Sequence, residues 1–110
     1  MKRKGENTMT KHTLYIGLYD KESKRQEITT IDAFKVVANI FKNTTGGATI
    51  SEAMGVYTYN DGTIAIEPSL RCEIFGADLE PVYAAISQIK TALNQEKIAL
   101  EETEVNSKFI

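Results

Sequence analysis

Three side-chain types in this chain could together recognise a small nucleotide: tyrosine rings, an arginine and an asparagine. Rings stack on adenine, a guanidinium pairs with phosphate, and an amide hydrogen-bonds a base edge. The candidate ligand-binding residues are Tyr57, Arg71 and Asn94, together with Tyr15, Glu73 and Phe109. Ordinary structural roles stay open for the first three, because Tyr57 could seal a subunit contact, Arg71 could form an ion pair and Asn94 could end a helix.

Two neighbouring basic residues, Lys24 and Arg25, lie in a charged segment at 20–27. Adjacent cations can hold an anion such as phosphate, so this segment is a candidate second anion site. A solvated surface loop is the alternative interpretation.

The chain carries one histidine, His12, and one cysteine, Cys72, and no pattern pairs them as base and nucleophile. Motifs of zinc proteases, P-loop enzymes and dinucleotide-binding enzymes are absent. Arg71 and Asn94 are the residue types that small ferredoxin-like acylphosphatases use on phosphate, but the Gly-rich, Arg-bearing first loop of that family is missing at 17–21. We therefore expect a binding protein without a catalytic residue, metal or cofactor.

The composition is that of an ordinary globular protein, with 110 residues, 42% hydrophobic and 25% charged. It predicts one domain over residues 11–110 after a disordered leader over 1–10, with Met9 as an alternative start. The formal charge of −2 argues against a long nucleic acid as partner. No apolar run approaches the ~20 residues that cross a bilayer, and no signal peptide is visible, so we expect a cytoplasmic location and no membrane partner.

Residues 46–76 favour one long β-hairpin, with strands at 48–59 and 63–75 and an Asn-Asp-Gly turn at 60–62. A three-residue loop, which sets Tyr59 opposite Thr63, separates apolar from polar side chains, whereas a two-residue turn mixes them on both faces. One face then holds the apolar set Ile50, Met54, Val56, Ile64, Ile66, Leu70, Cys72 and Ile74. The other face holds Thr49, Ser51, Tyr57, Tyr59, Glu67, Arg71 and Glu73. Pro68 cannot donate to the ladder, so we expect a bulge there.

The remaining pattern predicts two strands and two helices, at 13–19, 31–41, 79–93 and 97–105. Thr29 or Thr30 is expected to cap the first helix, and Asp78 the second. The order β-α-β-β-α-β predicts an α+β, ferredoxin-like fold, in which both helices cover one face of a four-stranded antiparallel sheet. The other face must meet water, a ligand or a second subunit, so we expect the protein to dimerise. It carries Tyr15, Tyr19, Tyr57, Tyr59, Ser51, Arg71 and Glu73.

Several short runs are similar to those of a phage family: LYIGLYDK at 14–21, QEITT at 26–30, GATISE at 47–52, GVYT at 55–58, DGT at 61–63 and LNQE at 93–96. Over most of 14–105 the chain resembles the anti-Thoeris signal sponges, phage proteins that defeat a TIR-based bacterial defence. The resemblance implies binding and sequestration, without cleavage, of a cyclic ADP-ribose isomer, glycocyclic ADP-ribose. It also implies a pocket between two subunits, a homodimer or hexamer in the infected cell, and a separate site for cyclic oligonucleotides. Only Asn94, in LNQE, matches the family pocket through its local motif.

Two other functions stay open at this point. A phage protein of this size could inhibit a host enzyme by protein contact. Alternatively, aromatic side chains on open strands can stack RNA bases, although the RNA-recognition consensus is absent and Glu67 and Glu73 would repel a nucleic-acid backbone.

Overall fold

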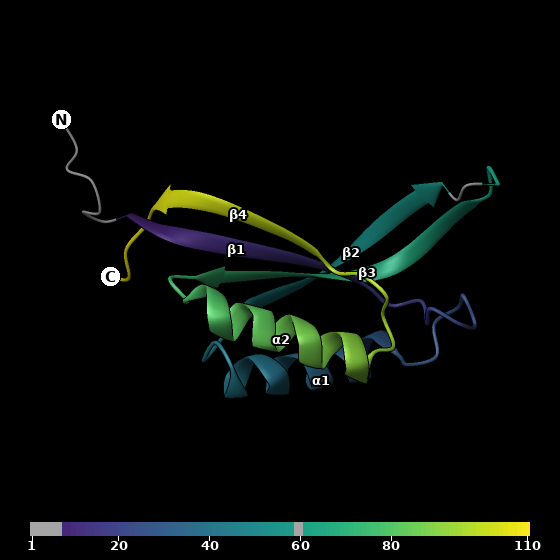
Figure 1. The fold of residues 1–110 in the computed structure, drawn as a ribbon, viewed down its shortest axis with the longest axis horizontal. Coiled ribbons are helices and arrows are strands. Elements are labelled where there is room, and N and C mark those ends of the chain that lie inside the picture. The colour runs from purple at the N-terminus through teal and green to yellow at the C-terminus, as the bar shows by residue number, and fades with distance from the viewer. Residues whose placement is uncertain (1–7, 59–60) are drawn as a thin grey trace.

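The computed structural model, which describes residues 8–58 and 61–110, has the predicted element order and the predicted fold class. The elements are β1 (Thr8–Gly17), α1 (Thr30–Asn43), β2 (Thr49–Thr58), β3 (Ile64–Phe75), α2 (Leu79–Ala92) and β4 (Ala99–Asn106). The four strands form one antiparallel sheet in the order β2-β3-β1-β4. Both helices lie against one face of this sheet, and the other face is left uncovered (Figure 1).

The register of the β2–β3 hairpin is the one that the three-residue loop predicts. Val56 lies opposite Ile66 and Glu52 lies opposite Leu70. Gly62, in the turn, has a φ of +86°, a conformation that glycine adopts without steric cost. Tyr59 and Asn60 lie outside the described residues, so the placement of Tyr59 on the open face stays a prediction.

The predicted bulge at Pro68 is wrong, because the ladder runs through Met54 opposite Pro68 without a shift. The Pro68 carbonyl accepts a hydrogen bond from the Leu18 N–H at 3.0 Å, so the backbone groups of Pro68 face the β1 side. In an extended strand the nitrogen and carbonyl of one residue point the same way. The missing N–H of proline therefore costs nothing in the pairing with β2.

The first strand begins earlier and ends earlier than predicted. β1 starts at Thr8, and Met9 pairs with Val105 of β4. The last three residues assigned to a disordered leader, 8–10, therefore belong to the sheet, while residues 1–7 lie outside the described range. The prediction of Tyr19 on the first strand is wrong, because β1 ends at Gly17 and Tyr19 lies in the following loop, where it forms an isolated bridge with Gln26.

Both helices start where the cap residues predict, but their caps differ. The Thr29 hydroxyl accepts a hydrogen bond from the Asp32 N–H at 3.2 Å. Asp78 occupies the N-cap position of α2 without a side-chain hydrogen bond to the helix. α1 continues two residues beyond its predicted end, to Asn43, and α2 ends at Ala92.

The core lies between the helices and the sheet, as the alternation in the strands predicts. Its largest fully buried members come from both helices, the central strands and the residue after β1: Leu14, Ile16, Leu18, Val37, Phe41, Leu70, Cys72, Val82 and Ile89. The apolar face of the hairpin, however, is only half covered. Leu70 and Cys72 are buried, whereas Val56 and Ile66 are 67% and 56% exposed, because the hairpin extends beyond the helices (Figure 1).

Among the described residues, neither helix is long and apolar enough to cross a membrane.

Candidate functional site

The face of the sheet opposite the helices holds Tyr15, Tyr57 and Arg71, as the sequence predicted. Tyr15 lies opposite Arg71 in the β1–β3 pairing and opposite Ala99 in the β1–β4 pairing. Tyr57 lies on the same face, further along the hairpin, opposite Ala65. Tyr15 is 39% exposed and Tyr57 is 46% exposed. Neither ring is in the core, so both are accessible to a ligand.

A hollow of about 460 Å³ lies on this face where β1 ends, between the base of the hairpin and the segment that leads into β4. We call it the tyrosine hollow. It is lined by Tyr15, Gly17, Tyr57, Thr58, Glu67, Gln95, Glu96, Lys97 and Ala99. Its volume is within the range of about 300–1,000 Å³ that small-molecule sites have.

The carboxylate of Glu67 is fixed in this hollow. Its Oε2 accepts a hydrogen bond from the backbone N–H of Tyr19 at 2.7 Å. The carboxylate lies directly on Gly17, since a Cβ at that position would be 2.6 Å from the Glu67 carboxyl carbon. Position 17 must therefore be glycine for Glu67 to lie where it does. This leaves a carboxylate with one oxygen held by the protein, beside two tyrosine rings.

Tyr19 holds the base of the hairpin through a second contact. The Tyr19 hydroxyl donates to the Ile66 carbonyl at 2.9 Å. Ile66 is the sequence neighbour of Glu67, whose carboxylate accepts from the Tyr19 backbone N–H. The loop after β1 is in turn held by Gln95, whose side-chain amide donates to the Tyr19 carbonyl at 2.8 Å. Gln95 is 8% exposed and joins the end of α2 to this loop.

The ring of Tyr57 lies over Gly55, where a Cβ would be 3.0 Å from the ring carbon Cε2. The same Cβ position is 3.2 Å from the Ser69 hydroxyl oxygen. Small residues on this face therefore leave room for the ring beside Gly55, at the edge of the tyrosine hollow.

Asn94 lies beside the tyrosine hollow rather than in its lining. It has a φ of +50° just after α2, and its amide donates to the Asp20 carboxylate at 2.7 Å and to Glu22 at 3.1 Å. The Asn94 hydrogen bond, with those from the backbone of Ser23 and Glu22, lowers the pKa of Asp20. Asn94 thus orders the loop that carries Tyr19, and its role as a ligand contact stays a prediction.

Arg71 and Glu73 form a neighbouring polar cluster on the same face. A guanidinium nitrogen of Arg71 lies 3.5 Å from Glu73 Oε1, and the Lys11 amine lies 3.3 Å from Glu73 Oε2. A hydrogen bond with Tyr15 and the charge of Glu73 raise the pKa of Arg71. Arg71 is not among the described residues that line the tyrosine hollow.

The structure does not bring the other predicted residues to this hollow. The side chain of Arg25 pairs with Glu27 at 2.8 Å and is 78% exposed, in a loop that also holds the Asp20 and Glu22 carboxylates. Lys24 takes a positive φ of 62° in that loop. Phe109 lines a different hollow, beside Phe75.

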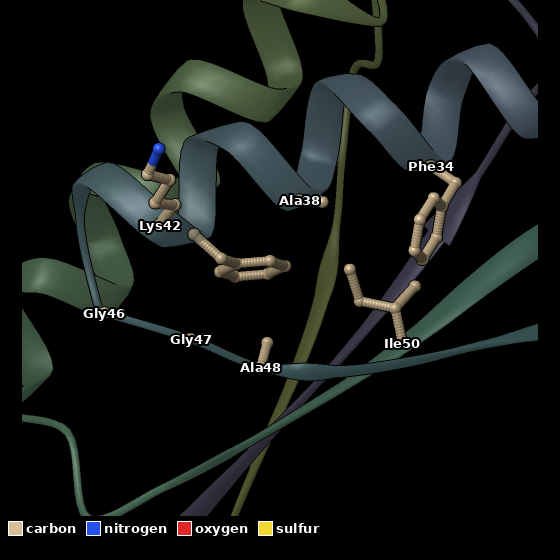
Figure 2. Close-up of a pocket in the computed structure, with 8 residues that line it drawn as sticks. Phe34, Ala38, Lys42, Gly46, Gly47, Ala48 and Ile50 are labelled. Atoms are coloured by element: carbon tan, nitrogen blue, oxygen red, sulfur yellow. The ribbon is translucent and has the colours of Figure 1, made fainter.

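A third hollow, between α1 and the start of β2, has the wrong chemistry for a nucleotide. Figure 2 shows Phe34 pointing from the helix toward Ile50 of the strand, with Ala48 also directed at the helix. Lys42 has the only charged side chain among its described lining residues, and its amino group points away from the groove (Figure 2). This groove offers apolar contact without a polar group that would orient a ligand.

No described residues form a cluster of three or more metal-ligating His, Cys, Asp or Glu side chains. Cys72 and His12 are both buried beneath the helices. Burial raises the pKa of the Cys72 thiol to about 12. One ring nitrogen of His12 lies 3.1 Å from the Ala77 carbonyl oxygen. A thiol that stays protonated and buried is not a nucleophile.

Sequence reasoning missed Glu67 and Gln95 as parts of the candidate site. Glu67 was placed on the correct face, but nothing local indicates that its carboxylate meets the backbone of a residue 48 positions away. The one available signal was Gly17, a glycine within a strand, which suggests close approach by another group.

No protein-family model matches the chain, and no curated protein matches it. Among solved structures, the chain is similar to a phage SAM lyase in complex with S-methyl-5′-thioadenosine, with 24% identity over 97% of this chain and 88% of that one and a TM-score of 0.69. It is also similar to CutA from Synechococcus elongatus (10% identity, 91% and 81% covered, TM-score 0.56). The divalent ion tolerance protein CutA1 from Ehrlichia chaffeensis is a third (18% identity, 90% and 84% covered, TM-score 0.54). These likenesses establish a shared fold, and none of them identifies the anti-Thoeris sponges.

Proposed function

We propose that this chain is a phage protein that binds a small adenosine-containing molecule in the tyrosine hollow, with S-adenosylmethionine as the first candidate ligand. The observation that carries the proposal is the Glu67 carboxylate, held by the Tyr19 N–H beside the rings of Tyr15 and Tyr57. The likeness to a phage SAM lyase along nearly the whole chain supports this choice of ligand.

The chemistry of the lining suits a nucleoside that carries a positive centre. Tyrosine rings offer stacking surfaces to adenine. Glu67 and Glu96 supply negative charge for a sulfonium or ammonium group, and a carboxylate also accepts hydrogen bonds from ribose hydroxyls. Lys97, the only cation among the described lining residues, is available to the carboxylate of an amino-acid moiety.

Cleavage of the bound nucleoside is a second candidate activity, favoured by the lyase likeness. The expectation of a protein that holds its ligand unchanged stays a prediction beside it. Mass spectrometry after incubation with S-adenosylmethionine and denaturation of the protein separates the two activities. Cleavage breaks the bond between the sulfonium sulfur and the γ-carbon of the amino-acid chain: the ligand's own carboxylate displaces the sulfur and closes a lactone, and S-methyl-5′-thioadenosine leaves. These two products therefore mean cleavage, whereas recovery of intact S-adenosylmethionine means sequestration.

A cyclic ADP-ribose isomer is the alternative ligand, favoured by the Arg71 guanidinium next to Tyr15 on the same face. Its two phosphates would need cationic partners, and the tyrosine hollow itself offers Lys97 and two carboxylates. If this is the ligand, Arg71→Ala weakens binding by about tenfold or more, the loss expected of a charged hydrogen bond. Isothermal titration with wild type and variant measures the change.

The direct test is a thermal-shift and calorimetric panel with S-adenosylmethionine, S-methyl-5′-thioadenosine, glycocyclic ADP-ribose and, as a negative control, uridine. The proposal predicts saturable heat and a raised melting temperature with at least one adenosine-containing compound and none with uridine. No response to any of the three adenosine compounds would overturn it.

A further inference from the structure

Gln95 lines the tyrosine hollow with a side-chain amide whose orientation is fixed by the protein. Its Nε2 donates to the Tyr19 carbonyl at 2.8 Å and to the Leu93 carbonyl at 3.2 Å. A glutamine amide has two N–H donors, so both are in use. A flipped amide would place its oxygen against these two carbonyl oxygens, so the two hydrogen bonds determine which amide atom is the oxygen.

The remaining polar atom of this side chain, Oε1, is an acceptor that is accessible to a ligand. It accepts no hydrogen bond within residues 8–58 and 61–110. Among the side chains of these residues that are not exposed, His12 Nδ1 is the one fully buried polar atom without a hydrogen bond. The Gln95 Oε1 is therefore not fully buried, although the residue as a whole is only 8% exposed. The tyrosine hollow is the surface that Gln95 lines, so Oε1 is available there.

Tyr19 connects this acceptor to the carboxylate of Glu67. The backbone N–H of Tyr19 binds Glu67, and the backbone carbonyl of the same residue binds Gln95. The Lys21 N–H also donates to the Asn94 carbonyl at 3.0 Å, which holds this loop to the end of α2 a second time. The hollow therefore presents two acceptors, one charged and one neutral, that are both held by one residue.

We propose that the Gln95 Oε1 accepts a hydrogen bond from the 6-amino group of a bound adenine, so that the tyrosine hollow selects 6-aminopurine nucleosides. The inference rests on the proposed function, since it names the group that would distinguish adenine from other purines at that site. The amino group of adenine is a donor and needs an acceptor when it loses water. The ribose hydroxyls and the positive centre of such a ligand have stronger partners in the Glu67 and Glu96 carboxylates, which leaves the neutral amide for the base.

The same arrangement rejects a purine with a carbonyl at position 6, such as hypoxanthine or guanine. The oxygen of that base would lie against the Gln95 Oε1, and neither atom has a hydrogen to share. The amide cannot turn to offer a donor without giving up its hydrogen bonds to the Tyr19 and Leu93 carbonyls. Leaving these acceptors unpaired is expected to weaken binding by about tenfold or more.

The test is isothermal titration with S-methyl-5′-thioadenosine and its 6-oxo analogue, 5′-methylthioinosine. Gln95→Met removes the acceptor and nearly preserves the length of the side chain. Gln88→Met, at an exposed position of α2 outside the described lining, is the matched control. The readout is the ratio of the two affinities, because a variant that only loosens the Tyr19 loop weakens both compounds together. Thermal melts verify that each variant is folded.

Wild type and Gln88→Met are expected to bind the adenine compound about tenfold or more tightly than the inosine compound. In Gln95→Met the ratio is expected to fall close to one. Equal affinities in wild type would overturn the inference and leave the proposed function standing, and this comparison needs no variant to fold. A wild-type ratio in folded Gln95→Met would also overturn it.

Two further outcomes separate this inference from its alternatives. The 2′-deoxy analogue of S-methyl-5′-thioadenosine tests a ribose hydroxyl as the donor to Oε1. If Gln95→Met loses the discrimination against that analogue and keeps the discrimination between the two bases, the assignment to adenine is overturned. If wild type binds neither S-methyl-5′-thioadenosine nor S-adenosylmethionine nor glycocyclic ADP-ribose, the proposed function and this inference fail together.

Discussion

At the residue scale, the candidate site depends on the close approach of Glu67 to Gly17. Substituting Gly17→Ala places a methyl group where the Glu67 carboxylate lies, so the carboxylate must move from its hydrogen bond with Tyr19. We expect affinity for the adenosine ligand to fall by about tenfold or more, which corresponds to ~1.4 kcal/mol. Isothermal titration measures it. Gly47→Ala is the matched control, because an added Cβ there meets nothing within 4 Å; equal affinity of the two variants would argue against a fixed Glu67.

The buried thiol of Cys72 predicts a pH dependence of stability. Its pKa is about 12 in the folded protein and about 8.5 in an unfolded chain. Because the folded pKa is the higher one, this contribution is complete below pH 8.5 and is lost as the pH rises toward 12. The loss at pH 10 is about 2 kcal/mol of unfolding free energy.

Urea unfolding at pH 8 and pH 10 checks the thiol prediction. Other groups titrate in the same range, so the comparison is with Cys72→Ala. Between the two pH values this variant should lose about 2 kcal/mol less unfolding free energy than wild type. The same loss in both proteins would show that the thiol is not responsible.

The residue scale also shows where the sequence was informative about the site. Alternation along the strands correctly placed Tyr15, Tyr57 and Arg71 on the open face, because strand periodicity is a local property. The partners of Glu67 and Asn94 could not be predicted in this way. Glu67 bonds to Tyr19 and Asn94 to Asp20, and both contacts join segments far apart in the chain.

At the element scale, the two helix starts offer a matched comparison. Thr29 caps α1 through a hydrogen bond to the Asp32 N–H, whereas Asp78 precedes α2 without such a bond. Thr29→Ala should therefore lower the free energy of unfolding by about 1 kcal/mol, and Asp78→Ala should lower it by less. Chemical denaturation of the two variants and wild type measures both values. A larger loss from Asp78→Ala would contradict the assignment of the caps.

Only part of the structure of the hairpin could be predicted from the sequence pattern. Its register was predictable, because a slip by one residue would move every apolar side chain to the wrong face. The effect of Pro68 on the strand pairing could not be predicted, because it depends on where β1 ends. Gly17 is the last residue of β1, so the Pro68 nitrogen lies just past the end of the β1 ladder, where the Leu18 N–H bonds the Pro68 carbonyl.

At the scale of the whole molecule, the order of strands and helices determined the fold, and chain pattern alone was sufficient to predict it. The extent of the core was missed, because the whole apolar face of the hairpin was taken as buried although helix length sets how much of it is covered. α1 and α2 have 14 residues each, whereas β3 has 12 residues. A helix rises about 1.5 Å per residue and a strand about 3.3 Å, so the strands outrun the helices and leave Val56 and Ile66 exposed.

The tyrosine hollow opens on one face of the hairpin base, and the exposed apolar side chains of Met54, Val56, Ile64 and Ile66 lie on the other face. Val56→Lys should therefore keep the ligand response of wild type, and isothermal titration of the folded variant checks this.

The central claim is that Glu67 holds an adenosine-containing ligand in the tyrosine hollow, and calorimetry with Glu67→Gln tests it most directly. Glutamine keeps an oxygen for the Tyr19 N–H while removing the charge. Glu52→Gln, at an exposed position of β2 outside the hollow, is the control. We predict saturable binding of S-adenosylmethionine by wild type and by Glu52→Gln, and a loss of about tenfold or more in Glu67→Gln. Equal affinity in all three proteins, or no binding by any of them, would contradict the account.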